Sequence, residues 1–168
     1  MVALKKAEQG KIKLDENINN KLTSWKLPDN EFTAQQKVTL ANLLGHTAGL
    51  TVHGFPGYAV GEKLPTLPQV LDGAEPANTA AVRVNMTPGT KFRYSGGGTT
   101  IMQLALMDIE KKPFPQIAQE TVLKRLEMTN SSYEQPLPPD WLTRAAAGYR
   151  RDGSEVETFE KAFAQQHG

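Results

Sequence analysis

The stretch that decides the fold is residues 88–98, Pro88-Gly89-Thr90-Lys91-Phe92-Arg93-Tyr94-Ser95-Gly96-Gly97-Gly98, which leads directly into residues 99–110. Residues 99–110 carry apolar side chains on nearly every side of a helix: Ile101, Met102, Leu104, Ala105, Leu106, Met107 and Ile109. A surface helix keeps a polar face, whereas a helix that is apolar all round is buried. We therefore expect a central, buried helix over 99–110, entered through three glycines.

The three glycines admit several interpretations. Backbone N–H groups at a helix N-terminus bind phosphate, but no Gly-Lys-Ser or Gly-Lys-Thr follows the glycines, so a phosphate loop is not favoured. A nucleophile elbow needs glycine two residues before the serine, and Arg93 stands there relative to Ser95. The simplest alternative is that the glycines let the chain pack closely against a core helix.

Working outward from this stretch, the pattern predicts further helices at 1–9, 14–18, 40–44 and 113–127, with Pro113 at the first helical position. Glycines mark a turn over 45–50, residues 25–36 resemble a polar connector, and 51–76 is expected to be mostly loop. Short strands are expected at 82–85, 91–94 and 145–158, the last folded as a hairpin around Asp152-Gly153.

Composition limits the classes of function. Lys and Arg number 19 against 18 Asp and Glu, and the resulting net charge of +1 gives no reason to expect nucleic acid as a partner. The absence of cysteine excludes disulfides and thiolate chemistry. The N-terminus does not resemble a signal peptide and no apolar run is long enough for a membrane span, so the chain as written is expected to stay in the cytoplasm.

Three motifs together resemble a known family. They are Leu43-Leu44-Gly45-His46-Thr47-Ala48-Gly49-Leu50, then Pro88-Gly89 with Phe92 to Gly98, then Ala147-Gly148-Tyr149. In order and spacing they are similar to the serine β-lactamase-like family of class C β-lactamases, D-Ala-D-Ala carboxypeptidases and related esterases. Residues 4–15 also resemble the second half of that family's nucleophile helix and the turn after it. We expect a partial domain of this family over 1–157 and an unassigned tail over 158–168.

The resemblance implies an α+β fold, mostly the helical subdomain of a β-lactamase or penicillin-binding-protein-like serine hydrolase, with most of the sheet absent. It implies acyl transfer through an acyl-enzyme on a small-molecule ester, peptide or β-lactam, with no cofactor and no metal. Tyr94 matches the family's catalytic tyrosine, and Ser95 and Gly96 match its substrate-binding neighbours. Many members have asparagine where Gly96 stands, which favours ester or peptide substrates over β-lactams. Family members are often periplasmic or secreted.

The family's nucleophile is a serine in Ser-x-x-Lys, and this sequence has none. The serines are Ser24, Ser95, Ser131, Ser132 and Ser154, and none has lysine three positions later. The family's closing Lys/His-x-Gly strand is also missing and is expected after residue 168. Two hypotheses follow: a truncated acyl hydrolase, inactive alone, whose uncovered apolar surface promotes self-association, or a non-catalytic binding or scaffold domain that retains the pocket walls.

Other polar residues give weaker signals. His46 and His53 lack a third ligand at a metal-binding spacing, so we expect turn histidines bonded to backbone rather than a metal site. Asp108 and Glu110 are expected to be solvated or capping charges rather than a catalytic carboxylate pair.

Overall fold

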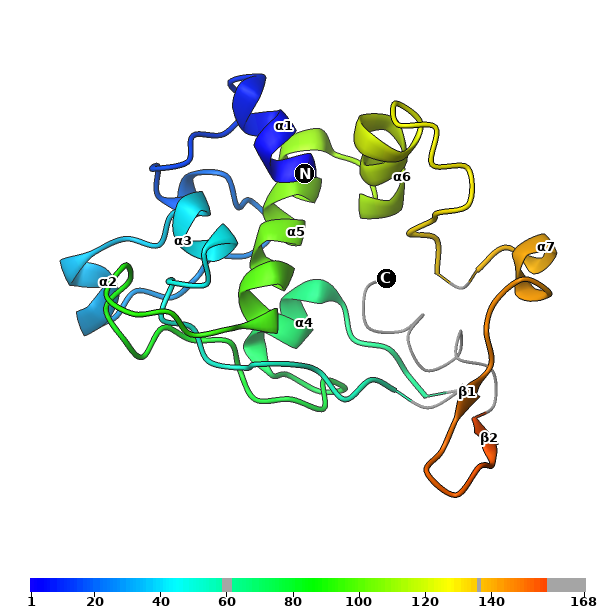
Figure 1. Cartoon of the computed structure of the whole chain (residues 1–168). Coiled ribbons are helices and arrows are strands. Elements are labelled where there is room, and N and C mark those ends of the chain that lie inside the picture. Colours follow the sequence, from blue (N-terminus) through cyan, green and yellow to red (C-terminus); the bar gives the residue numbers. More distant parts are fainter. Residues whose placement is uncertain (59–61, 136, 157–168) are drawn as a thin grey trace.

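The computed structural model describes residues 1–58, 62–135 and 137–156, and one long helix organises it. Helix α5 (Gly96–Glu110) runs through the middle of the molecule, and α3 (Leu40–Leu44), α4 (Leu67–Asp72) and α6 (Phe114–Ala118) pack against it (Figure 1). Helix α1 (Val2–Glu8) lies beside the C-terminal half of α5. The predicted central helix is therefore confirmed.

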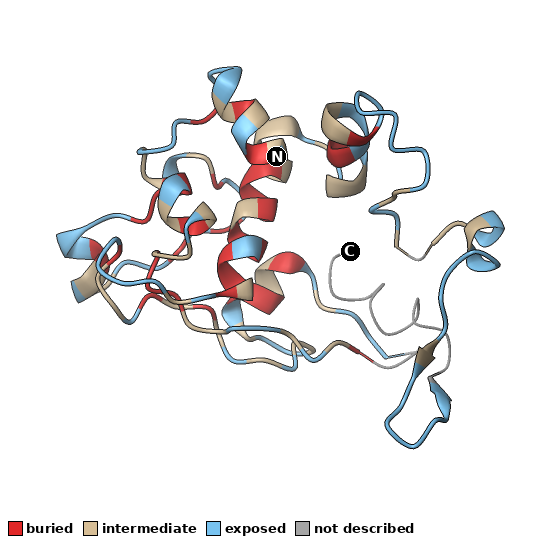
Figure 2. Ribbon diagram, viewed as in Figure 1, coloured by how far each residue is buried: buried red, intermediate tan, exposed pale blue. Residues whose placement is uncertain are grey.

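Helix α5 is buried over most of its length, as Figure 2 shows in red. It begins three residues earlier than expected because Ser95 acts as its N-cap, its hydroxyl accepting a hydrogen bond from the Gly98 N–H at 3.1 Å. The glycines permit close packing: a Cβ on Gly97 would lie 2.8 Å from both methyl groups of Val82, and one on Gly98 would lie 3.2 Å from Leu50. The close-packing interpretation of the glycines is thus correct.

Shorter elements complete the described chain. They are α2 (Glu31–Gln35), the short α7 (Pro139–Leu142), a 3-10 turn η1 (Ile18–Asn20) and a π-helical turn η2 (Gln119–Leu123) that continues α6. Pro113 precedes the first residue of α6 as its N-cap, and the helical stretch ends before residue 127. The strands β1 (Gly148–Tyr149) and β2 (Glu155–Val156) pair antiparallel.

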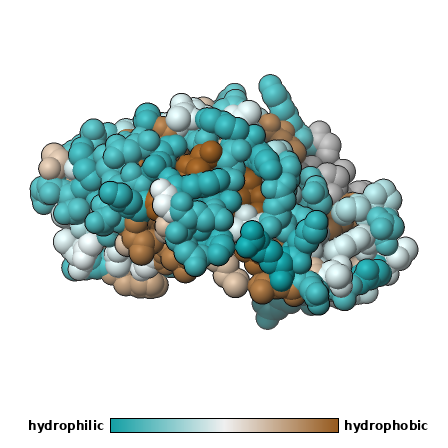
Figure 3. Space-filling view, turned by 90° about the horizontal axis from the view of Figure 1, so that it is seen from above, coloured by the Kyte–Doolittle hydropathy of each residue, from teal (hydrophilic) through white to brown (hydrophobic). Residues whose placement is uncertain are grey.

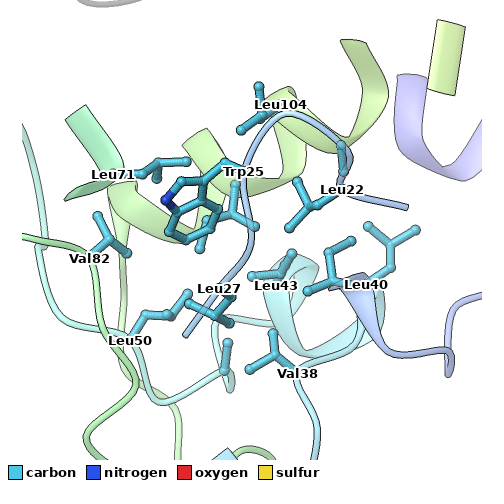
Figure 4. Close-up of a cluster of buried hydrophobic side chains, with 14 of the residues drawn as sticks. Leu22, Trp25, Leu27, Val38, Leu40, Leu43, Leu50, Leu71, Val82 and Leu104 are labelled. Atoms are coloured by element: carbon cyan, nitrogen blue, oxygen red, sulfur yellow. The ribbon is translucent and has the colours of Figure 1, made fainter. Parts of the chain in front are cut away.

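The core includes residues from segments without regular structure. Figure 4 shows Trp25 and Leu27 among Leu22, Leu43, Leu71, Val82 and Leu104, all buried. The expectation of a polar connector over 25–36 is therefore wrong, because this segment contributes Trp25 and Leu27 to the core and contains α2. Likewise the expected loop over 51–76 contains α4, which Thr66 caps.

Two predicted strands and one predicted helix do not form. Residues 82–85 make one isolated β-bridge, Leu50 to Val84, and 91–94 form no strand, because the Arg93 N–H is bonded to the carbonyl of His46 at 2.7 Å. Residues 14–16 bend without forming a helix, and the helical turn begins at Ile18 with Asn17 as its cap. The hairpin around Asp152-Gly153 is confirmed; residues 157–158 of the third expected strand and the tail 158–168 lie outside the described residues.

The described part of the chain is thus a helical assembly with one two-stranded hairpin, as expected for the helical subdomain of an α+β fold. No helix within it is both long enough and apolar enough to cross a membrane.

Candidate functional site

Tyr94 lies at the surface where the chain enters α5. Its side chain is 55% exposed, which leaves the phenol open to a ligand. One face of its ring packs against the imidazole of His46, with 4.6 Å between ring centroids and 39° between the planes. Tyr94 is therefore held at its base while the rest of the ring meets solvent.

His46 contacts each of the residues 92–95. Its ring meets Phe92 edge-on at 6.0 Å and packs against Tyr94, its carbonyl accepts from the Arg93 N–H, and its Nδ1 accepts from the Ser95 N–H at 3.4 Å. The last hydrogen bond is long, so the ring packing and the 2.7 Å bond from Arg93 contribute most. His46 adopts φ 52, a left-handed conformation that residues other than glycine rarely take.

His53 holds the same segment from the other side. Its Nδ1 lies 2.7 Å from the carbonyl oxygen of Tyr94, and because a carbonyl only accepts, Nδ1 carries the proton. The His53 carbonyl in turn accepts from the Gly96 N–H at 3.0 Å. The two histidines therefore fix the backbone on both sides of Tyr94, as the expectation of backbone-bonded turn histidines required.

Ser95 is buried and serves the helix cap. Its hydroxyl faces the carbonyls of Thr51 and Val52 at 2.8 and 3.0 Å while accepting from Gly98. The N–H of Gly97 is bonded to the Val52 carbonyl. The first N–H groups of α5 are all occupied by protein, so this helix end offers no phosphate site, as the sequence indicated.

Gly96 lies beneath a neighbouring loop. A Cβ at this position would come within 3.0 Å of the His53 carbonyl oxygen and 3.4 Å of the Phe55 ring. A larger side chain would therefore push the loop outward. Contact of Ser95 or Gly96 with substrate stays a prediction.

Arg93 ties together the segments around the site. Its guanidinium donates to the Gly49 carbonyl at 2.6 Å and to the Asn85 side chain. The guanidinium of Arg93 therefore donates hydrogen bonds within the protein, to the turn at Gly49 and to Asn85.

The carboxylates of α5 lie at the opposite end of the helix from Tyr94. Asp108 accepts from the backbone N–H groups of Thr23 and Ser24 at 2.7 and 3.1 Å, and Glu110 forms ion pairs with Lys6 and Lys11 at 3.1 and 2.7 Å. Partial burial raises the pKa of each carboxyl, but these hydrogen bonds outweigh it and the net pKa lies below the ordinary value. Both carboxylates serve the fold.

An apolar groove of about 640 Å³ runs beside α5, between α1 and α6. Its walls include Val2, Leu44, Met102, Leu106, Phe114 and Val122, and Thr99 in the first turn of α5 brings one end near the residues that precede the helix. Seen from above, apolar patches appear between the polar side chains over the middle of the molecule (Figure 3). Among the described residues, no three histidine or carboxylate side chains gather as metal ligands would.

The contacts of His46 and His53 with Tyr94 were not foreseen from the sequence. His46 comes from the turn over 45–50 and His53 from the loop that follows it, both far from residue 94 in the chain, and neither lies at a spacing that marks a partner of Tyr94. One available signal was the position of His46 after a glycine in a tight turn, where histidine tolerates a left-handed backbone better than most residues.

Comparison with known proteins identifies relatives over most of the chain. The chain is 24% identical over 157 residues to Protein flp of Staphylococcus aureus, covering 92% of this chain and 29% of that protein. It resembles a β-lactamase/D-alanine carboxypeptidase of Yersinia pestis, solved with citrate (TM-score 0.67, 22% identity, 98% of this chain and 44% of that one). It also resembles a D-stereospecific amidohydrolase of Streptomyces (TM-score 0.66, 16% identity, 96% and 49%).

The chain therefore spans less than half the length of each of these proteins. The two solved structures show the same fold as this chain. A family model described as Beta-lactamase matches residues 1–166. From this match and the shared fold, the chain belongs to the beta-lactamase family.

Proposed function

We propose that this chain forms the tyrosine-bearing wall of a serine acyl hydrolase, with Tyr94 as the general acid/base. The observation that carries the proposal is the placement of Tyr94: its phenol is exposed while two histidines fix its ring and backbone. A proton-transfer group must be reachable by substrate and must be held in one place. Tyr94, the residue that matches the family's catalytic tyrosine, combines both properties.

In the proposed reaction, a serine hydroxyl supplied by a Ser-x-x-Lys segment attacks the substrate carbonyl. Tyr94 and the lysine of that segment together accept the proton of the hydroxyl as the bond between the serine oxygen and the carbonyl carbon forms. Tyr94 then gives a proton to the leaving group as the bond between that group and the carbonyl carbon breaks. Water then hydrolyses the acyl-enzyme. Ser95 and Gly96 contribute to the substrate-binding wall beside the phenol, and for Ser95 the contribution is indirect, because its hydroxyl is buried in the helix cap.

The proposed substrates are small molecules with an activated carbonyl. The Yersinia pestis relative is described as a β-lactamase/D-alanine carboxypeptidase and the Streptomyces one as a D-stereospecific amidohydrolase, which supports carbonyl substrates. Gly96 offers no side-chain amide to a ligand, and the loop at His53 and Phe55 occupies the space above it. We therefore favour esters or peptides over β-lactams.

Covalent catalysis needs a nucleophile with an adjacent base, so we expect no acylation of the 168-residue chain itself. The chain is incubated with a fluorescent penicillin and, separately, with an activated ester, and its intact mass is measured. An unchanged mass agrees with the proposal. Stoichiometric acylation at any serine would contradict it.

The sequence of the flanking DNA separates the truncated hydrolase from a scaffold domain. An in-frame Ser-x-x-Lys upstream of Met1 supports the hydrolase, and a stop codon there supports the scaffold.

In the longer chain, Tyr94→Phe should lower ester hydrolysis by about 100-fold or more, the usual contribution of a positioned acid or base. Wild-type hydrolysis by this variant would leave Tyr94 a structural role alone.

A further inference from the structure

We infer that His46 is a positioning residue for Tyr94, an inference that rests on the proposed role of Tyr94 in acyl transfer. Its imidazole supports the tyrosine ring at 4.6 Å, and its backbone and ring bind the two residues that flank Tyr94 in sequence. A ring packed on one face cannot rotate freely toward that side. The imidazole of His46 therefore restricts the orientations that the Tyr94 ring can take.

The backbone of His46 is strained for the sake of these contacts. A left-handed conformation at a residue other than glycine is unfavourable and persists only where the surroundings enforce it. Glycine would remove that strain, but it would also remove the ring that contacts Phe92 and Tyr94. Val52, whose carbonyl faces the Ser95 hydroxyl, is also left-handed, at φ 58, so strain gathers around the base of Tyr94.

The hydrogen bond from Ser95 assigns one tautomer to His46. Since Nδ1 accepts from the Ser95 N–H, the proton of the neutral ring is on Nε2. His53 has the opposite assignment, with its proton on Nδ1 toward the Tyr94 carbonyl. Opposite tautomers of two histidines on one tyrosine give a spectroscopic signature that simple packing would not require.

Two substitutions separate the ring of His46 from its acceptor. His46→Asn keeps a side-chain acceptor and tolerates the left-handed backbone, but removes the ring. His46→Phe keeps a ring and removes the acceptor. Glu127→Asn, at an exposed residue with φ 54, is the matched control for placing asparagine in a left-handed conformation.

The first test uses nuclear magnetic resonance on the 168-residue chain and needs no activity. We expect proton contacts between the rings of His46 and Tyr94, an Nε2–H tautomer at His46 and an Nδ1–H tautomer at His53. In His46→Asn the Tyr94 ring signals should shift, and in His46→Phe the Ser95 amide signal should shift, while Glu127→Asn changes neither. Absence of ring contacts in the wild type, or Tyr94 signals unchanged in His46→Asn, would overturn the inference.

The second test measures ester hydrolysis by this chain joined to an upstream Ser-x-x-Lys segment, where the flanking DNA encodes one. His46→Asn should lower kcat about 10-fold to 100-fold with a smaller change in KM, because a misplaced acid or base slows the chemical step more than binding. If Tyr94→Phe is inactive but His46→Asn keeps the wild-type kcat, the inference about His46 is refuted while the proposed role of Tyr94 stands. Unchanged activity in Tyr94→Phe would refute the proposed function, while the spectra still decide whether His46 orients the ring.

Discussion

At the scale of single residues, Gly49 decides how the turn after α3 meets the segment before α5. It has φ 68, and a Cβ on it would lie 2.0 Å from the Met86 carbonyl oxygen. Its own carbonyl accepts from the Asn85 N–H at 3.0 Å and from Arg93. Neither the backbone conformation nor the space at this position admits a side chain.

We therefore predict that Gly49→Ala lowers the free energy of unfolding by at least about 3 kcal/mol, because a left-handed alanine and a backbone clash add together. Urea unfolding of the purified chain measures this change. Gly54→Ala is the matched control, since a Cβ there has no neighbour within 4 Å, and it should change stability by less than about 0.5 kcal/mol. If the two variants are equally stable, the prediction is wrong and the turn at Gly49 rearranges to accept a side chain at little cost in free energy.

The sequence singled out Tyr94 as a candidate catalytic residue, but it did not predict which residues surround it. The three motifs that resemble the family include Tyr94 and also His46, yet only the fold brings the two rings together. Ser95 was predicted as a substrate-binding residue, and its buried hydroxyl caps α5 instead of facing solvent. A cap and a ligand contact both favour serine before a helix, so local sequence does not distinguish them.

At the scale of elements, α5 and the hairpin around Asp152-Gly153 were predictable, whereas the strands expected at 82–85 and 91–94 did not form. The apolar residues of α5 repeat within the helix itself, so the pattern is local. An extended segment becomes a strand only when another segment pairs with it, and residues 91–94 instead bond to a turn that lies far back in the chain. The contact between α1 and α5 also joins segments far apart in the chain, through the ion pair between Lys6 and Glu110.

Glu110 anchors α1 to the C-terminal end of α5. A carboxylate is unfavourable near a helix C-terminus, so the lysines offset both the helix dipole and partial burial. The side chain of Glu110 is 12% exposed and that of Lys6 is 8% exposed, whereas that of Lys11 is 46% exposed. The Lys11 contact is the shorter of the two, but solvent screens the exposed Lys11, so we expect the buried Lys6 pair to contribute more to stability.

We predict that Glu110→Gln destabilises the chain by about 3 kcal/mol at pH 7, because it leaves the Lys6 charge buried without its partner. Lys11→Gln, which removes the exposed partner, should cost less than about 1 kcal/mol. Thermal or urea unfolding measures both variants. A Lys11→Gln variant as unstable as Glu110→Gln would contradict the assignment of the interaction to Lys6.

The same pair gives a pH dependence with a defined sign. The pKa of Glu110 in the folded chain lies below its ordinary value of 4.5, because the hydrogen bonds from Lys11 and Lys6 outweigh the effect of burial. The unfolded state therefore binds more protons near and below pH 4.5, and stability from Glu110 is present above that pH and lost as the pH falls further. The difference in stability between wild type and Glu110→Gln should shrink over this range.

At the scale of the whole molecule, the chain spans less than half the length of the solved relatives that it resembles and has an open apolar face. The groove between α1, α5 and α6 contains no charged side chain among its described lining residues. Met1, the N-cap of α1, and Leu4 within α1 are also largely exposed. Apolar surface that lacks a covering element favours association with other molecules.

Our last prediction is that the 168-residue chain self-associates as its concentration rises, because contact through this groove removes apolar surface from water. Sedimentation velocity over a range of concentrations measures the association. Met102→Lys places a charge in the groove and should shift the chain toward monomer, since that charge cannot be buried without a partner. Gln36→Lys places the same charge on an exposed residue that does not line the groove and should leave association unchanged.

A wild-type chain that stays monomeric throughout and unfolds in one sharp transition would refute the prediction. Association reduced equally by both lysines would instead attribute it to net charge, because only a contact at the groove distinguishes residue 102 from residue 36.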